Sequence, residues 1–180
     1  MKRLVLLFLF VFSSLFSQNK YEEGERLYNA KKLIEAQKIY TLLYTENPKD
    51  LFAIERLGDI AVAKTEWEKA KLYFKKLILY SPKNANYHYK YGGAVGLHAK
   101  NCNKFKALGM LDEIENSFLK AIILDPKHID ARKALVSYYL EVPGIVGGSL
   151  SKAKMYAKEL SQISVKEGQW ANIQIQNHLN

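Results

Sequence analysis

Histidine and cysteine, the side chains that most often bind transition metals or act as nucleophiles, are scarce in this sequence. There are four histidines and one cysteine, and no two histidines have the H-x-x-x-H spacing of a helical metal site. Cys102 follows His98 by four residues, one helical turn, but a Cys–His nucleophile pair also needs support from the rest of the fold. We interpret Cys102 as a loop cysteine. The pattern argues against a metal enzyme or a thiol enzyme.

Neighbouring carboxylates are the next candidates for chemistry. Asp112, Glu113 and Glu115 lie close together, as general acid–base pairs can. They also lie where a helix is expected to begin, and acidic residues favour the positive end of a helix dipole. No G-x-S-x-G nucleophile elbow is present. Helix capping is therefore the simpler interpretation of these acids.

A glycine-rich segment at 144–149 could cradle a phosphate if it led from a strand into a helix. It lacks the G-x-x-x-x-G-K-[ST] sequence, and no strand is expected before it. We interpret it as a flexible turn, with Ser149 or Ser151 as the N-cap of the next helix.

The elements that position these residues follow a repeat of 34 residues. Gly24, Gly58 and Gly92 are separated by this interval. The same interval relates pairs of small, large and proline residues, which are Ala36 and Ala70, Tyr40 and Phe74, Leu43 and Leu77, and Pro48 and Pro82. Such a period is typical of a helix–turn–helix repeat. The small residues let two helices approach, the large ones fill the space around that contact, and proline ends the second helix.

This pattern resembles the tetratricopeptide repeat (TPR) family, although no unit has the early tryptophan of its consensus. The resemblance implies an all-α, right-handed solenoid of antiparallel helix pairs, with about 3.5–4 repeats and a C-terminal capping helix. The units are expected at 18–50, 51–84, 85–127 and 128–168, followed by the cap at 169–180. Thr65 and Glu68 are expected to form a capping box. A helical bundle without regular stacking is the alternative fold.

The period is broken twice. Pro82 and Pro126 are 44 residues apart, so the third unit carries an insertion, which we place within 98–112. It is either a polar loop or the result of lengthening both helices. The fourth unit is degenerate: helices at 128–141 and 150–163 are joined by the glycine segment, which resembles a loop of some bacterial TPR proteins.

In the TPR family the first helix of each unit lines a concave face. Aromatic residues mixed with acids at these positions predict a groove for a peptide with basic and apolar side chains. The alternative is that several of the aromatics are core residues, and Tyr138 fits either interpretation equally. Lysine, asparagine and arginine of the family's carboxylate clamp are absent here. The register assigns to the groove Tyr21, Glu25, Tyr28, Asn29, Phe52, Glu55, Asp59, Tyr89, Leu97 and Tyr138.

The N-terminus has the pattern of a secretory signal peptide. Lys2 and Arg3 precede an apolar run at 4–12 and a small, polar stretch at 13–18. The apolar run is shorter than the ~20 residues of a spanning helix. We expect cleavage after Ser17 and export to the periplasm or the extracellular space. A buried N-terminal helix or an uncleaved anchor is the alternative.

The chain has a formal net charge of +9. Loss of Lys2 and Arg3 leaves +7, spread over lysine pairs that keep helix surfaces solvated. Export makes nucleic acid an improbable partner, whereas peripheral association with an anionic envelope surface fits this charge. With one cysteine, no intramolecular disulfide can form. The oligomeric state is left open.

Together these observations predict a non-catalytic scaffold of the bacterial cell envelope that binds a protein or a peptide and uses no cofactor or metal. The alternative is a carrier of a small ligand, with a pocket roofed by the insertion at 98–112 and the loop at 143–149. An enzyme is a third and weaker hypothesis, because no catalytic constellation is found.

Overall fold

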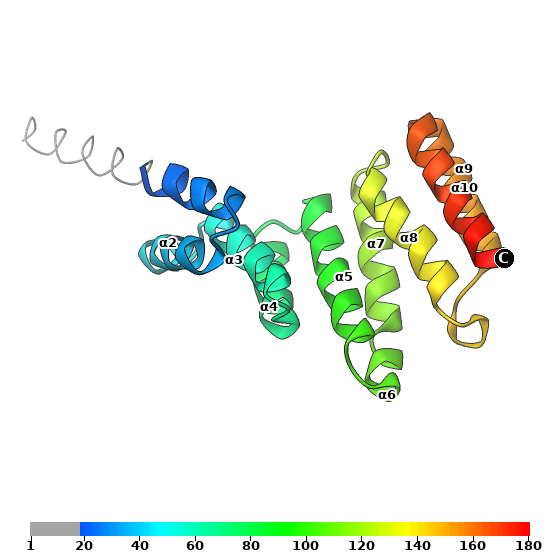
Figure 1. Cartoon of the computed structure of the whole chain (residues 1–180), viewed down its shortest axis with the longest axis horizontal. Helices are drawn as coiled ribbons and strands as arrows, with labels where there is room; N and C mark the ends of the chain where they lie inside the picture. Colours follow the sequence, from blue (N-terminus) through cyan, green and yellow to red (C-terminus); the bar gives the residue numbers. More distant parts are fainter. Residues whose placement is uncertain (1–18) are drawn as a thin grey trace, which may run out of the picture. The chain divides into compact units, whose positions relative to one another are not determined.

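The computed structural model describes residues 19–180, which fold into helices joined by short connections without any strand in that range (Figure 1). The expected signal peptide at 1–17 lies outside the described residues. Within 19–180 no helix has both the length and the apolar character needed to cross a membrane. The chain divides into two compact units at Tyr80 and Ser81, and each unit is described separately.

The first unit consists of two antiparallel helix pairs. A helix at 19–29 precedes α2 (Leu33–Glu46), and α3 (Leu51–Ala63) precedes α4 (Trp67–Tyr80). Helix α3 packs against both α2 and α4. The buried core around α2 and α3 consists of Leu27, Ala36, Tyr40, Leu43, Ala53, Leu57 and Ile60.

The glycines of the 34-residue period each lie against an aromatic ring of the paired helix. A Cβ atom on Gly24 would lie 2.9 Å from Tyr40 Cζ, and one on Gly92 would lie 2.9 Å from Phe118 Cε1. The expected role of these small residues is therefore confirmed. The helices approach closely because hydrogen replaces a side chain at the contact.

The turns inside both pairs have the same backbone geometry. Lys31 and Thr65, 34 residues apart, each have a φ of 59°. The amide after each donates to the carbonyl five residues back, as in Glu66 N to Ala61 O at 2.8 Å. This is the Schellman motif, which usually places glycine at the left-handed position. The expected capping box at Thr65 is wrong, because Thr65 is the left-handed residue that follows Lys64, the C-cap of α3, and α4 begins only at Trp67.

The second unit contains α5 (Ala85–Lys100), α6 (Lys104–Leu108), α7 (Leu111–Leu124), α8 (Ile129–Glu141), the 3₁₀ turn η1 (Gly144–Val146), α9 (Leu150–Ile163) and α10 (Val165–Leu179). Helix α7 packs against α5 and α8, and α9 packs against α8 and α10. Side chains of Asn84, His128, Ser149 and Ser164 cap the N-termini of α5, α8, α9 and α10.

The insertion is mainly helical, and of the expected polar loop only residues 101–103 lie outside a helix. Helix α5 has 16 residues whereas α3 has 13, and α6 adds a further short turn. Helix α7 has 14 residues, as α4 does. Only the first helix of the pair is lengthened, and it continues through Ala99, where the first unit has its left-handed turn residue.

The connection between α8 and α9 is a hydrogen-bonded turn. The amides of Val146 and Gly148 both donate to Pro143 O, at 3.0 and 3.1 Å, and Ser149 N donates to Tyr139 O at 2.9 Å. A Cβ atom on Gly148 would lie 1.7 Å from Val142 O, so this position requires glycine.

The last helix is longer than expected. It begins at Val165, not 169, because Ser164 serves both as the C-cap of α9 and as the N-cap of α10. Helix α10 packs along α9 and also contacts α8.

Candidate functional site

The predicted groove residues of the first unit surround a residue that the sequence reasoning missed, Arg56. Its guanidinium forms a two-pronged ion pair with Glu25, with Nε–Oε1 at 2.6 Å and NH2–Oε2 at 2.9 Å. A third contact joins NH1 to Asp59 Oδ2 at 3.1 Å. The Arg56–Asp59 spacing of three residues was the available signal, since such pairs share a helix face.

Aromatic rings enclose the same guanidinium. Its carbon lies 4.9 Å from the ring centre of Phe52 and 5.3 Å from that of Tyr28. Tyr21 meets Phe52 edge to face, with ring centres 5.7 Å apart, and donates its hydroxyl to Asp50, the N-cap of α3. Planar arginine suits both the stacking and the carboxylate contacts. We call this surface, formed by Tyr21, Glu25, Tyr28, Phe52, Glu55, Arg56 and Asp59, the Arg56 face.

The electrostatics of the Arg56 face follow from these contacts. The Arg56 hydrogen bonds, with a further bond from the Tyr40 hydroxyl at 2.5 Å, hold the pKa of Glu25 below its usual range. The pKa of Tyr40 is raised, mainly by burial and secondly by its hydrogen bond to Glu25. Glu25 is therefore charged and paired, with its side chain partly exposed on this face. Asn29, near the end of the same helix, is exposed and lies at the edge of this set.

In the second unit the predicted groove residues separate into two places. Tyr89 is half-buried, with its ring centre 5.2 Å from that of His128 and 6.1 Å from that of Phe118. Leu97 and Tyr138 instead line a pocket. Tyr138 is buried, and its hydroxyl donates to Leu111 O at 3.3 Å. Burial and nearby Glu115 raise the pKa of Tyr138 to about 12, so it is neutral at physiological pH.

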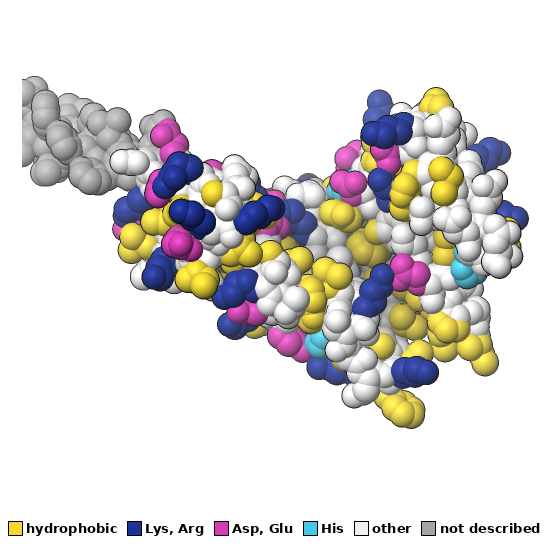
Figure 2. Space-filling view, in the orientation of Figure 1, with side chains coloured by type: hydrophobic (Ala, Val, Ile, Leu, Met, Phe, Trp, Pro, Cys, Tyr) yellow, Lys and Arg dark blue, Asp and Glu magenta, His cyan; other side chains and the backbone are white. Residues whose placement is uncertain are grey.

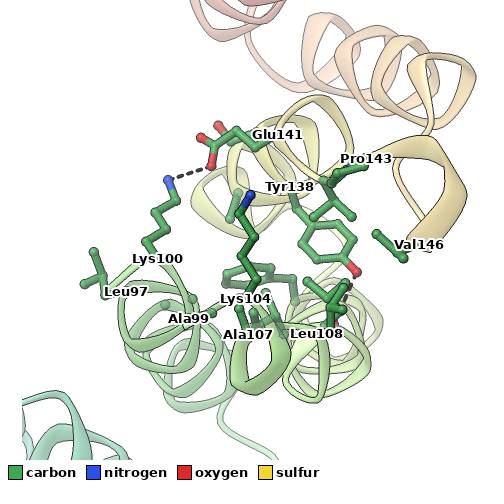
Figure 3. Close-up of a pocket in the computed structure, with 18 residues that line it drawn as sticks. Leu97, Ala99, Lys100, Lys104, Ala107, Leu108, Tyr138, Glu141, Pro143 and Val146 are labelled. Atoms are coloured by element: carbon green, nitrogen blue, oxygen red, sulfur yellow. Dashed lines mark hydrogen bonds and ion pairs between the residues drawn. The ribbon is translucent and has the colours of Figure 1, made fainter. Parts of the chain in front are cut away.

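The pocket has a volume of about 580 Å³ and is almost wholly apolar. Helices α5, α6 and α7 form one side and α8 with the following turn forms the other (Figure 3). Both segments expected to roof a pocket contribute to the lining. We call it the α5–α8 pocket; its apolar lining includes Leu97, Ala99, Ala107, Leu108, Leu111, Ile114, Phe118, Ala134, Val142, Pro143 and Val146.

Charged groups lie only at the edge of the α5–α8 pocket. Lys100 Nζ pairs with Glu141 Oε2 at 2.6 Å, and Lys104 extends from α6 towards α8 beside this pair (Figure 3). Among residues 19–180, Lys104 has no ion-pair partner. Two strongly exposed apolar residues are sequence neighbours of the lining residues Lys104 and Val146. They are Phe105, which is 87% exposed, and Ile145, which is 94% exposed. Figure 2 shows hydrophobic side chains gathered at α6 and at the α8–α9 connection.

Two of the histidines, the cysteine and two of the acidic residues first considered for chemistry lie at helix ends or contact backbone carbonyls. His128 caps α8, and His88 Nε2 lies 2.9 Å from Pro82 O. Cys102 makes long contacts of 3.5 Å with the carbonyls of Ala99 and Asn103. Asp112 and Glu113 lie in the first turn of α7, as expected from capping. In the part of the chain that the structure describes, no group of three or more His, Cys, Asp or Glu residues is placed to hold a metal ion.

No protein-family model and no curated protein matches the chain. The fold nevertheless defines its structural class: it is the TPR-like solenoid fold that the 34-residue period predicts, and the expected fold class is confirmed.

Three solved structures illustrate this similarity. TTC0263, a thermophilic TPR protein of Thermus thermophilus, is 17% identical, with a TM-score of 0.74 over 91% of this chain and 83% of its own. MamA from Desulfovibrio magneticus RS-1 is 17% identical, with a TM-score of 0.63 over 82% and 73% of the two chains. The TPR domain of Arabidopsis OM64 is also 17% identical, with a TM-score of 0.54 over 71% and 95%.

Proposed function

We propose that the protein is a non-catalytic scaffold of the bacterial cell envelope that holds a protein or peptide on the Arg56 face. The observation that carries this proposal is the pre-arranged face itself. Two half-exposed aromatic rings are fixed against a guanidinium that two carboxylates orient. Rigid aromatic surfaces lose little entropy on binding, and helical repeat arrays use such surfaces for recognition.

The charge of the Arg56 face indicates the chemistry of its partner. Glu25, Glu55 and Asp59 contribute three negative charges and Arg56 contributes one positive charge, which leaves a formal charge of −2. An extended or helical segment with basic and apolar side chains complements such a surface. Basic groups of the partner would meet Glu55 and Asp59, while its apolar groups would cover Tyr28 and Phe52.

A photo-crosslinking amino acid in living cells tests this face. Placed at Tyr28, it should capture one discrete partner, whereas at Leu72, which is 68% exposed on α4, it should not. Glu55→Lys should reduce the yield at position 28, because it reverses one charge of the face. Equal capture at both positions, or an unchanged yield with Glu55→Lys, would count against the assignment.

A second candidate function, carriage of a small ligand, is favoured by the α5–α8 pocket. Its volume of about 580 Å³ lies within the range of ligand sites, which are mostly apolar with a few polar groups at fixed places. Native mass spectrometry of the purified protein should then detect a bound small molecule. A clean ligand-free mass, with no thermal shift across a metabolite panel, would argue against this function.

A further inference from the structure

We propose that the α5–α8 pocket binds a single-chain aliphatic carboxylate, with its hydrocarbon chain in the cavity and its carboxylate beside Lys104. This inference rests on the second candidate function, carriage of a small ligand, and names the class of that ligand.

The interior of the pocket selects a hydrocarbon chain. Its walls are formed mainly by aliphatic side chains of α5, α6, α7 and α8, with Phe118 and Tyr138 as the two aromatic residues. Among the described residues, every buried side-chain nitrogen or oxygen already has a hydrogen-bond partner. No group inside therefore requires a polar ligand atom, and burial of apolar area is the available source of affinity.

The edge of the pocket selects a negative charge at one end of that chain. Lys100 is neutralised by Glu141 at 2.6 Å, so Lys104 supplies the net positive charge among the lining residues. Its side chain reaches from α6 towards α8, across the space between the two walls (Figure 3). A monoanionic head group beside Lys104 leaves the hydrocarbon chain directed inward.

The exposed apolar side chains near the pocket fit the same ligand. Phe105 lies on α6 next to a lining residue in the chain, Leu108 lies on α6 and is 46% exposed, and Ile145 precedes Val146. Isolated exposed apolar residues need no explanation, but Leu108 also lines the pocket. Its exposed part therefore continues the apolar wall of the cavity to the protein surface.

Isothermal titration calorimetry tests the proposal. The full-length chain is expressed and the protein is purified in the form that the cell produces. Each probe is used below its critical micelle concentration. Decanoate, dodecanoate and tetradecanoate should bind with dissociation constants that fall about fourfold for each buried methylene. Dodecanol should bind more weakly than dodecanoate, and dodecylamine more weakly still, because it brings a positive charge to Lys104.

Two variants separate the head-group contact from the cavity. Lys104→Met should weaken dodecanoate roughly fivefold, as expected for a partly exposed ion pair, and leave dodecanol unchanged. Lys120→Met, which removes an exposed charge from α7 outside the pocket, should change neither affinity. Ala107→Phe, at a half-buried lining position on α6, fills the cavity and should weaken both probes at least tenfold.

Each outcome either supports or overturns the proposal. If dodecanol binds as tightly as dodecanoate, or Lys104→Met has no effect on dodecanoate, the carboxylate assignment is wrong while the carrier function survives. If no probe binds and native mass spectrometry finds another small molecule, the ligand class is wrong. If no probe binds and the protein carries nothing, the carrier function fails with it. Capture of a peptide by a crosslinker at Phe105, with no probe binding, would assign the pocket to a protein partner.

Discussion

Gly58 on α3 lies directly against the ring of Phe74 on α4, so closely that a Cβ atom on Gly58 would be 2.5 Å from Phe74 Cε1. Both residues are buried, and Phe74 is 1% exposed. The ring is therefore enclosed in the core, where a methyl group on Gly58 would overlap it. This contact is the physical basis of the 34-residue period, because Gly24 with Tyr40 and Gly92 with Phe118 repeat it.

Gly58→Ala should destabilise the first unit by about 1–2 kcal/mol net. Because the Cβ would approach the ring to 2.5 Å, the overpacking cost should lie in the upper part of the usual range of about 1–3 kcal/mol, and the better helix propensity of alanine offsets roughly 1 kcal/mol of it. Chemical denaturation measures the difference. Gly93→Ala is the control: nothing lies within 4 Å of its Cβ position, so this substitution should raise stability. A neutral Gly58→Ala would mean that the two helices separate easily.

Thr65→Gly should stabilise the protein. Thr65 has a φ of 59°, and a left-handed conformation costs a non-glycine residue roughly 1–2 kcal/mol. Glycine adds about 0.5–1 kcal/mol of unfolded-state entropy, so the expected net gain is about 0.5–1 kcal/mol. Lys31→Gly, at the equivalent turn, should act in the same direction. A lower melting temperature for both variants would contradict the Schellman geometry.

The Arg56 face should contribute to stability in a pH-dependent way. Because the pKa of Glu25 is lowered in the folded state, its contribution is fully present above the unfolded value near 4.5 and is lost as the pH falls below it. Glu25→Gln should cost about 1 kcal/mol at pH 7 and flatten the decline in stability below pH 4.5. Denaturation curves measured across this range test the effect. Glu22→Gln, at an exposed neighbour, should leave the curve unchanged.

Gly148→Ala should disrupt the α8–α9 connection, because its Cβ would lie 1.7 Å from Val142 O. The turn would shift Pro143 and Val146, two residues of the α5–α8 pocket wall. We expect a loss of several kcal/mol, since backbone atoms must move. Gly144→Ala, with nothing within 4 Å, should be tolerated. Near-identical unfolding curves for the two variants would show that the connection rearranges freely.

The pattern of the N-terminal segment predicts that the chain is cleaved after Ser17 during export. If 1–17 is a signal peptide, the chain recovered from the envelope fraction should begin at Gln18, and intact-mass measurement decides this. Replacing Leu7 with Arg should interrupt the apolar run and leave the full-length chain inside the cell. An unprocessed chain in the envelope would instead favour an uncleaved anchor.

The repeat could be predicted from the order of residues alone. Gly58, Phe74 and Pro82 recur at a fixed interval because each solves the same local problem of helix approach, core filling or helix ending. Such problems involve residues close in the chain, so their solution is visible in spacing. The helices at 150–163 and around 128–141 were predicted for the same reason, from apolar periodicity and from the N-cap serine.

The chemistry of the surfaces, in contrast, depends on tertiary packing. Arg56 pairs with Glu25, 31 residues away, and no local pattern marks that partner. Lys100 likewise meets Glu141 only after α5 is lengthened and α8 packs across α7. The pocket depends on where α6 and the 144–146 turn fall against these helices. Spacing along the chain specifies each helix and the neighbour that it packs against. Charge pairs and cavities form between segments that are distant in the chain. Whether such segments come into contact depends on how every element between them packs.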